Sequence, residues 1–280
     1  MYLVSLILAC GGTSNNTVNT SDPTTCDATT EPIILVMEKI EFARQSDGVA
    51  WGFDIDKLNS DSDDEEGCYH ADLMDPIGNQ GIDNAFSGLV PTLELTEANA
   101  AEGLLQDAIN TGELLLIIKI TGVDDFYNDD CVTVEVLRGE GTPIIGTEGK
   151  ILDGQTFARD NTIPSNIIEN VQIVDGIMLI SPLEMNLPFT ILDKELDFEI
   201  GDGVIRLDLS TEEIRGVLGG ATPRDYLEEI VQFNEIGITD LLLQLLSTAA
   251  DLYPDENGEC QYLSSAFEFT ALPAYLYANE

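Results

Sequence analysis

The chain has 280 residues, of which 44% are apolar, so it is long enough to bury a substantial hydrophobic core. Its 52 Asp and Glu residues against 11 Lys and Arg residues give a formal charge of -41. Such a charge repels the phosphates of nucleic acid and of anionic lipid, and we exclude nucleic acid as a partner. The acidic excess by itself fits the solubility of an exported protein, or adaptation to salty water, as well as a dedicated cationic ligand.

The chain begins with an apolar run, MYLVSLILACGG, that ends at a cysteine. In it, Ala9 followed by Cys10 resembles a bacterial lipobox, the signal in which a small residue precedes a cysteine that becomes lipidated. The resemblance implies a signal peptide over residues 1–9, truncated because the run is short and no Lys or Arg precedes Lys39. It also implies an acylated Cys10. The alternative is an apolar N-terminal strand with a free buried cysteine.

Residues 10–31 are expected to be the lipidated cysteine followed by a flexible tether. Residues 11–31 are mostly Gly, Ser, Thr, Asn and Asp, so they lack the apolar area that would offset their ordering entropy. Residues 32–280 are expected to form a single globular domain. No apolar run approaches the roughly 20 residues of a membrane-spanning helix, so we expect the membrane to be a partner through acyl chains alone.

The first half of the domain mixes predicted strands, helices and one long acidic loop. The apolar and aromatic content of residues 27–53 predicts two strands joined by a turn at residues 46–48. Residues 54–83 form the acidic loop, which contains the chain's single histidine. Helical spacing follows over residues 82–90 until Pro91, and again between Thr96 and Gly112. Residues 114–120, LLLIIKI, predict a strand buried on both faces.

The second half contains the clearest strand signals. An alternating strand leaves a second acidic turn near residue 130, and Asp175-Gly176 between two apolar runs predicts a hairpin. A second hairpin is predicted around residues 201–203. Residues 210–213, STEE, form a capping box that predicts a short helix, and two further helices are expected from Thr222 and from Thr239. The fold class expected is therefore α+β, with a mainly antiparallel, sandwich-like sheet, several helices toward the C-terminal half, and disulfides.

Four cysteines remain once Cys10 is assigned to lipid. They are Cys26, Cys68, Cys131 and Cys260. In an exported protein this number predicts two disulfides, whose three connectivities the sequence does not distinguish. A metal site is the rival interpretation, but there is no CxxC pair and the neighbouring Cys68 and His70 are too few ligands for zinc.

Three acidic turns run into Cys68, Cys131 and Cys260, and two of them have the alternate spacing of oxygen ligands typical of calcium loops. The predicted ligands of a weak calcium site are Asp54, Asp56, Asn59, Asp61, Asp63, Asp251, Asp255, Asn257 and Glu259. The match to an EF-hand fails after the third ligand, because Asp64 and His70 stand where the turn glycine and the bidentate glutamate belong. The alternative is that Asp, Asn and Gly simply form solvated turns.

No catalytic motif is present: HExxH, GxSxG, GxGxxG and the phosphate-binding loop are all absent from the sequence. The layout of the chain resembles the uncharacterised acidic lipoproteins of bacteria. The resemblance implies an exported protein, anchored by lipid in the outer membrane or periplasm. We expect a non-enzymatic binding or structural role with calcium-stabilised loops and a protein or small-molecule ligand that the sequence does not name. The alternatives are a secreted hydrolase that uses paired carboxylates and a periplasmic carrier of an apolar ligand.

Overall fold

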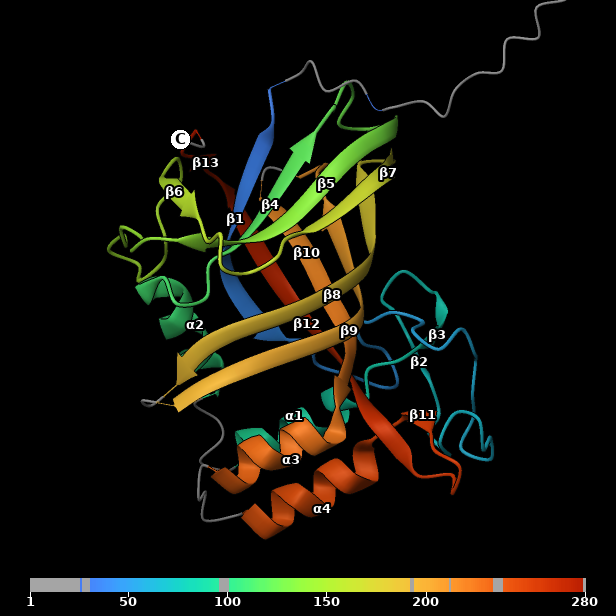
Figure 1. Cartoon of the computed structure of the whole chain (residues 1–280). Coiled ribbons are helices and arrows are strands. Elements are labelled where there is room, and N and C mark those ends of the chain that lie inside the picture. The colour runs from blue at the N-terminus through green and yellow to red at the C-terminus, as the bar shows by residue number, and fades with distance from the viewer. Residues whose placement is uncertain are drawn as a thin grey trace, which may run out of the picture.

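Eight antiparallel strands close into a barrel within the part of the chain that the structure describes (Figure 1). The structure is a computed structural model that describes residues 26, 31–95, 101–191, 194–211, 213–233 and 239–278. The barrel strands are β1 (Ile33–Phe42), β4 (Leu116–Thr121), β5 (Asp129–Glu140), β7 (Asn166–Val174), β8 (Ile177–Ile191), β9 (Lys194–Asp208), β10 (Ile214–Pro223) and β12 (Cys260–Pro273). Their order is β5-β4-β1-β12-β10-β9-β8-β7, and pairing of β7 with β5 closes the ring.

Alternate side chains of the barrel strands fill the interior over the residues whose burial the structure describes. On β5, Val132, Val134 and Val136 are buried, whereas the intervening Thr133 and Glu135 are only half-buried. The pairing registers continue this alternation around the ring, because residues directly opposite each other share a face of the sheet. The interior also contains Leu35, Met37, Ile118, Ile120, Val171, Ile173, Met178, Ile180, Ile205, Leu207, Leu218, Phe267 and Phe269.

Helices and short strands cover the outside of the barrel (Figure 1). Helix α1 (Phe86–Glu94) packs on β12, α2 (Ala101–Thr111) packs on β1, and α3 (Arg224–Phe233) packs on α4 (Thr239–Ala249) at one end. The remaining strands are β2 (Leu73–Met74), β3 (Gln80–Ile82), β6 (Thr156–Arg159), β11 (Leu252–Pro254) and β13 (Tyr275–Leu276). None of the described helices is long and apolar enough to cross a membrane.

The predicted sandwich-like α+β fold is wrong, because the sheet closes on itself and its interior side chains all meet in one core. Two local predictions fail for related reasons. The STEE capping box does not start a helix, since residues 214–223 form β10 in the middle of the ladder between β9 and β12. The predicted turn at residues 201–203 lies inside the continuous strand β9, where Asp202 has a positive φ of 48° and the ladder register shifts.

Other local predictions are confirmed. The Asp175-Gly176 turn joins β7 to β8 with φ values of 52° and 78°, which is the backbone conformation that Asp-Gly tolerates in a type I′ hairpin. Helix α4 begins at Thr239, as its sequence predicts. The helix predicted to stop at Pro91 instead contains this proline and ends at Glu94.

The prediction of two disulfides is confirmed: Cys26 is bonded to Cys131 and Cys68 to Cys260. Their Cα atoms are 5.2 Å and 6.1 Å apart, and the bridges close loops with sequence separations of 105 and 192. Loops of this length stabilise the fold mainly by constraining the unfolded chain, by about 4 to 5 kcal/mol each in the chain-entropy model. Cys10 and most of the predicted tether lie outside the described residues.

We expect the substitution Gly216→Ala to destabilise the barrel. A Cβ at Gly216 would lie 2.2 Å from Phe269 Cζ and 2.8 Å from the Arg206 carbonyl oxygen, so the core would have to shift. Overpacking of this kind destabilises by about 1 to 3 kcal/mol, and thermal unfolding followed by circular dichroism would measure it. The control is Gly103→Ala in α2, where a Cβ meets nothing within 4 Å and where alanine favours the helix. Equal melting temperatures for the two variants would contradict the expectation.

Candidate metal centre

A long loop leaves β1 and lies on the outer face of β10 and β12 before it enters α1. Within it, Trp51 and Phe53 pack against the buried Val217. Gly219 on β10 permits this close approach, because a Cβ there would lie 2.8 Å from the Phe53 ring. The loop is thereby held against a rigid wall, which fixes the acidic residues that follow Phe53.

The carboxylate of Asp83 organises the backbone of the loop. Its Oδ2 atom accepts hydrogen bonds from the backbone N–H of Ile55 at 2.6 Å and of Asp56 at 3.3 Å. The Asp83 backbone N–H in turn donates to the Phe53 carbonyl oxygen at 2.9 Å. Asp83 is therefore clamped beside the start of the acidic loop, although 27 residues separate it from Asp56.

Three carboxylates converge at this point. Asp54, Asp56 and Asp83 each offer an oxygen that lies within 4.8 Å of the other two. Oδ1 of Asp54 is shielded from solvent and has no hydrogen-bond partner, whereas the ammonium group of Lys57 contacts the carbonyl oxygen of Asp54 and not its carboxylate. A buried carboxylate oxygen without a partner loses its hydration without compensation, so the site favours a cation or a proton.

Burial raises the pKa of Asp83 to about 8, since a side chain that is 4% exposed disfavours the charged form. The N–H of Ile55 opposes this shift, and the negative charges of Asp56, Asp251 and Asp72 add to it. Burial likewise is the main cause that raises the pKa of Asp72. Asp83 therefore holds its proton at a pH where ordinary carboxylates are ionised.

Asp251 adds a fourth carboxylate, from the junction of α4 and β11. Burial raises its pKa to about 7, although Ser264 stabilises the charged form by donating both its backbone N–H, at 2.8 Å, and its hydroxyl. The Ser264 oxygen also accepts the backbone N–H of Ala85 at 2.8 Å. This network joins β12 to the start of α1, and the negative charge of Asp251 adds to the rise in the pKa of Asp83.

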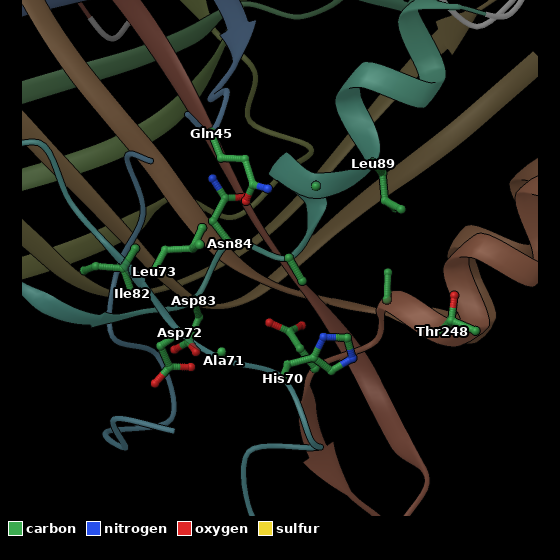
Figure 2. Close-up of a pocket in the computed structure, with 14 residues that line it drawn as sticks. Gln45, His70, Ala71, Asp72, Leu73, Ile82, Asp83, Asn84, Leu89 and Thr248 are labelled. Atoms are coloured by element: carbon green, nitrogen blue, oxygen red, sulfur yellow. The ribbon is translucent and has the colours of Figure 1, made fainter. Parts of the chain in front are cut away.

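A pocket of about 300 Å³ opens beside the cluster. Asp72 and Asp83 lie on its loop side, Leu89 and Thr248 lie across from them, and His70 projects toward it (Figure 2). Asp251 also lines the pocket. Two mostly buried carboxylates, those of Asp83 and Asp251, therefore line an opening in the surface.

The Cys68–Cys260 disulfide fixes the outer part of the loop to the first residue of β12. Gly67 and Ser60 pack tightly beside it, since a Cβ at Gly67 would lie 2.2 Å from Ser60 Oγ. Ser60 also donates its backbone N–H to Asp72 at 2.5 Å. Covalent and hydrogen-bonded ties therefore hold the loop at both ends of the acidic cluster.

The structure brings together two of the nine predicted calcium ligands, Asp54 and Asp56. A third, Asp251, lines the pocket beside them. The structure places Asn59, Asp61 and Asp63 on the exposed surface. The Asp61 carboxylate accepts the backbone N–H of Asp63 at 2.8 Å, which is an ordinary Asx turn.

The second predicted set, Asp255, Asn257 and Glu259, is also exposed. The Asp255 carboxylate accepts the backbone N–H of Asn257 at 2.8 Å and of Glu259 at 2.9 Å. These hydrogen bonds lower the pKa of Asp255. The carboxylate therefore stabilises its own turn between β11 and β12.

Sequence reasoning missed Asp83 and Asp72 as site residues. Both belong to the acidic stretch of residues 54–83, but neither has alternate spacing with Asp54 and Asp56. Asp83 follows the buried Ile82 directly, and a lone carboxylate beside an apolar strand residue is the only signal that the sequence offers for it.

No family model, curated protein or solved structure matches this chain.

In the presence of EDTA, we expect the free energy of unfolding to fall as the pH rises from about 5 to about 8. Asp83 and Asp251, with pKa values of about 8 and about 7 in the fold, bind protons that the unfolded chain has released above about pH 4, so their contribution is present at low pH and is lost as the pH rises. Groups with lowered pKa values act in the opposite direction, but only at lower pH. An example is Glu135, whose carboxylate accepts hydrogen bonds from Arg159 and has a pKa of about 2.

Urea unfolding at pH 5 and at pH 8 measures this slope. Asp83→Asn should make the slope shallower, because the amide does not titrate. The matched control Asp61→Asn removes a carboxylate from an exposed turn and should leave the slope as it is. A parent-like slope for Asp83→Asn would show that the buried carboxyl does not titrate in this range.

Proposed function

We propose that this protein is an exported, lipid-anchored protein of the cell envelope with a non-enzymatic binding role, and that its acidic loop binds a divalent cation, calcium in the first place. The observation that carries the cation is the convergence of Asp54, Asp56 and Asp83 around an unpartnered, buried carboxylate oxygen. A dication there would supply the missing partner and remove the repulsion among the three carboxylates.

Calcium fits the donor set better than other common metals. All three side chains offer hard oxygen atoms, which suit calcium and magnesium rather than zinc or copper. Oxygens up to 4.8 Å apart can lie on opposite sides of an ion whose Ca–O distances are about 2.3 to 2.6 Å. Of the three, Asp83 also lines the pocket, and on this side there is room for water ligands of a calcium ion.

Export is supported by the cysteines. Both disulfides join segments far apart in the chain, and such bonds persist in oxidising compartments such as the periplasm. The lipid anchor is supported by the apolar run that ends at Cys10 and by its lipobox-like small residue, Ala9. A calcium concentration in the extracellular range would suit a weak site with a Kd of about 10⁻⁴ to 10⁻³ M.

A hydrolase is the second candidate function, and one observation favours it. Asp83 and Asp251 line the same pocket with pKa values of about 8 and about 7, which is the range of a general acid at neutral pH. An esterase or glycosidase activity lost in Asp251→Asn would favour this function over cation binding. The carrier alternative needs an apolar cavity, and in the described part of the barrel the interior is occupied by buried side chains such as Met178 and Ile180.

We expect calcium to raise the melting temperature through Asp54, Asp56 and Asp83. At about ten times a millimolar Kd, binding to the folded state alone contributes about 1.4 kcal/mol, a shift of a few degrees for a chain of this length. Differential scanning calorimetry at pH 8 would measure it, with magnesium at equal ionic strength as the ion control because magnesium sheds its water reluctantly.

The double variant Asp54→Asn with Asp56→Asn should lose the calcium shift. Asp61→Asn with Asp63→Asn removes the same number of charges from an exposed turn of the same loop and should keep it. If the second pair abolishes the shift and the first does not, the site lies in the exposed turn instead.

We expect Cys10 to be acylated when the full chain is expressed in a bacterial host. Incorporation of labelled palmitate should be found in the parent and lost in Cys10→Ser. The other four cysteines are bonded in two disulfides and offer no free thiol for acylation. Label that remains in Cys10→Ser would therefore be nonspecific. Equal labelling of the variant and the parent would contradict the anchor.

A further inference from the structure

One end of the barrel carries a group of exposed apolar side chains, which we call the aromatic rim. It consists of Phe126, Tyr127, Val174 and Leu179, each between 55% and 58% exposed. Phe126 and Tyr127 lie in the loop between β4 and β5, Val174 ends β7, and Leu179 lies near the start of β8. Single exposed apolar side chains are common on protein surfaces, but a group of them at one place indicates an interaction site.

Backbone contacts hold the two parts of the rim together. The Gly176 N–H donates to the Tyr127 carbonyl oxygen at 2.8 Å, and the Asp175 N–H donates to the Asn128 side chain at 3.2 Å. These bonds tie the β4–β5 loop to the β7–β8 turn. Val174 pairs with Ile177, so the side chains of these two residues lie on the same face of the sheet. Leu179 follows Ile177 by two residues and therefore lies on this outer face as well.

The Cys26–Cys131 disulfide attaches the N-terminal segment at this same end. Cys131 is the third residue of β5, just beyond the loop that carries Phe126 and Tyr127. Only fifteen residues separate Cys10 from Cys26. A chain of that length reaches at most about 55 Å even when fully extended, so an acyl group on Cys10 must stay within that distance of the rim end.

The opposite end of the barrel carries helices α3 and α4 and has no such attachment among the described residues (Figure 1). The tether to a bilayer that holds Cys10 would therefore leave from the rim end. Phe and Tyr are suited to the boundary between headgroups and acyl chains, where Tyr keeps its hydroxyl in water. A second contact of this kind also strengthens an anchor, since a single acyl chain binds a bilayer only marginally.

The charges around the rim select the type of lipid. Asp129 accepts the backbone N–H groups of Asp124 at 2.7 Å and of Cys131 at 3.0 Å, and these bonds lower the pKa of its carboxyl. Asp125 accepts the N–H of Tyr127 at 2.7 Å. The rim is thus set among carboxylates, which suit the cationic groups of zwitterionic phospholipids and repel anionic ones.

We propose that the aromatic rim docks on the zwitterionic bilayer that carries the acyl chain of Cys10, so that the acidic cluster faces away from the membrane surface. This rests on the acylation of Cys10 in the proposed function, but it does not depend on cation binding. The rim orients the barrel, and the acyl chain holds it.

The test uses the acylated full chain with a tryptophan placed at either end. Phe126→Trp reports on the rim, and Leu241→Trp reports on α4, where Leu241 is 45% exposed at the other end of the barrel. Both variants retain Trp51, which is half-buried with the guanidinium of Arg206 at 5.2 Å from its ring, so the parent supplies the background. Each protein is reconstituted into phosphatidylcholine vesicles that contain lipids brominated near the headgroup.

Fluorescence of Phe126→Trp should be quenched at least about twofold more than that of Leu241→Trp, as expected for an aromatic side chain in the interfacial region. Replacing part of the phosphatidylcholine by phosphatidylglycerol should reduce this quenching, because the rim is set among carboxylates. Equal quenching of the two variants would overturn the docking, and so would stronger quenching of Leu241→Trp. A blue shift of Phe126→Trp in detergent that grows with protein concentration would also overturn it, because it would indicate that the rim self-associates.

Mass spectrometry before reconstitution separates this inference from the proposed function. An acylated protein whose Phe126→Trp signal is not quenched overturns the docking and leaves the anchor in place. A protein without an acyl mass overturns both. The calcium shift of the melting temperature is measured independently and bears on neither.

Discussion

The whole structure depends on one long-range ladder, the pairing of β5 with β7. β5 pairs with β4 along the chain and with β7 across the seam, and this second pairing turns a sheet with two open edges into a ring. Closure forces the alternating apolar residues of eight strands into one interior. Because apolar side chains fill that interior, polar chemistry is left to the loops outside, and the longest of these is fixed to the outer wall by Trp51 and Phe53.

The carboxylate that stabilises the acidic loop is also repelled by its neighbours. Asp83 stabilises the loop by accepting the N–H of Ile55, yet this places its carboxyl in a buried site near Asp54 and Asp56. Ionised carboxylates in such a place repel each other and lose their hydration, so either a proton or a cation must be held there. Protons and a dication would therefore compete for the same oxygens, and pH and metal concentration would act on the same loop.

How much could be predicted from the sequence depended on the range of the interactions. The Asp175-Gly176 hairpin and the start of α4 at Thr239 were predicted correctly, because neighbouring residues decide both. The STEE segment was misassigned because its capping signal is equally local, but β9 and β12 on either side draw residues 214–223 into the ladder. In the site, Asp54 and Asp56 were among the predicted ligands because they belong to the acidic loop, whereas Asp83 was missed because only the folded loop brings it beside them.

The sequence by itself determined the acidic charge, the even number of cysteines in the body, the alternation of the strands and the place of the acidic stretch. Each of these is a property of composition or of residues a few positions apart. Only the tertiary structure decided that the sheet closes, that Cys26 pairs with Cys131 and Cys68 with Cys260, and that Asp83 completes the carboxylate cluster. The physical reason is that these contacts join residues tens to hundreds of positions apart, and their free energy comes from burial and closure of the whole chain rather than from any local preference.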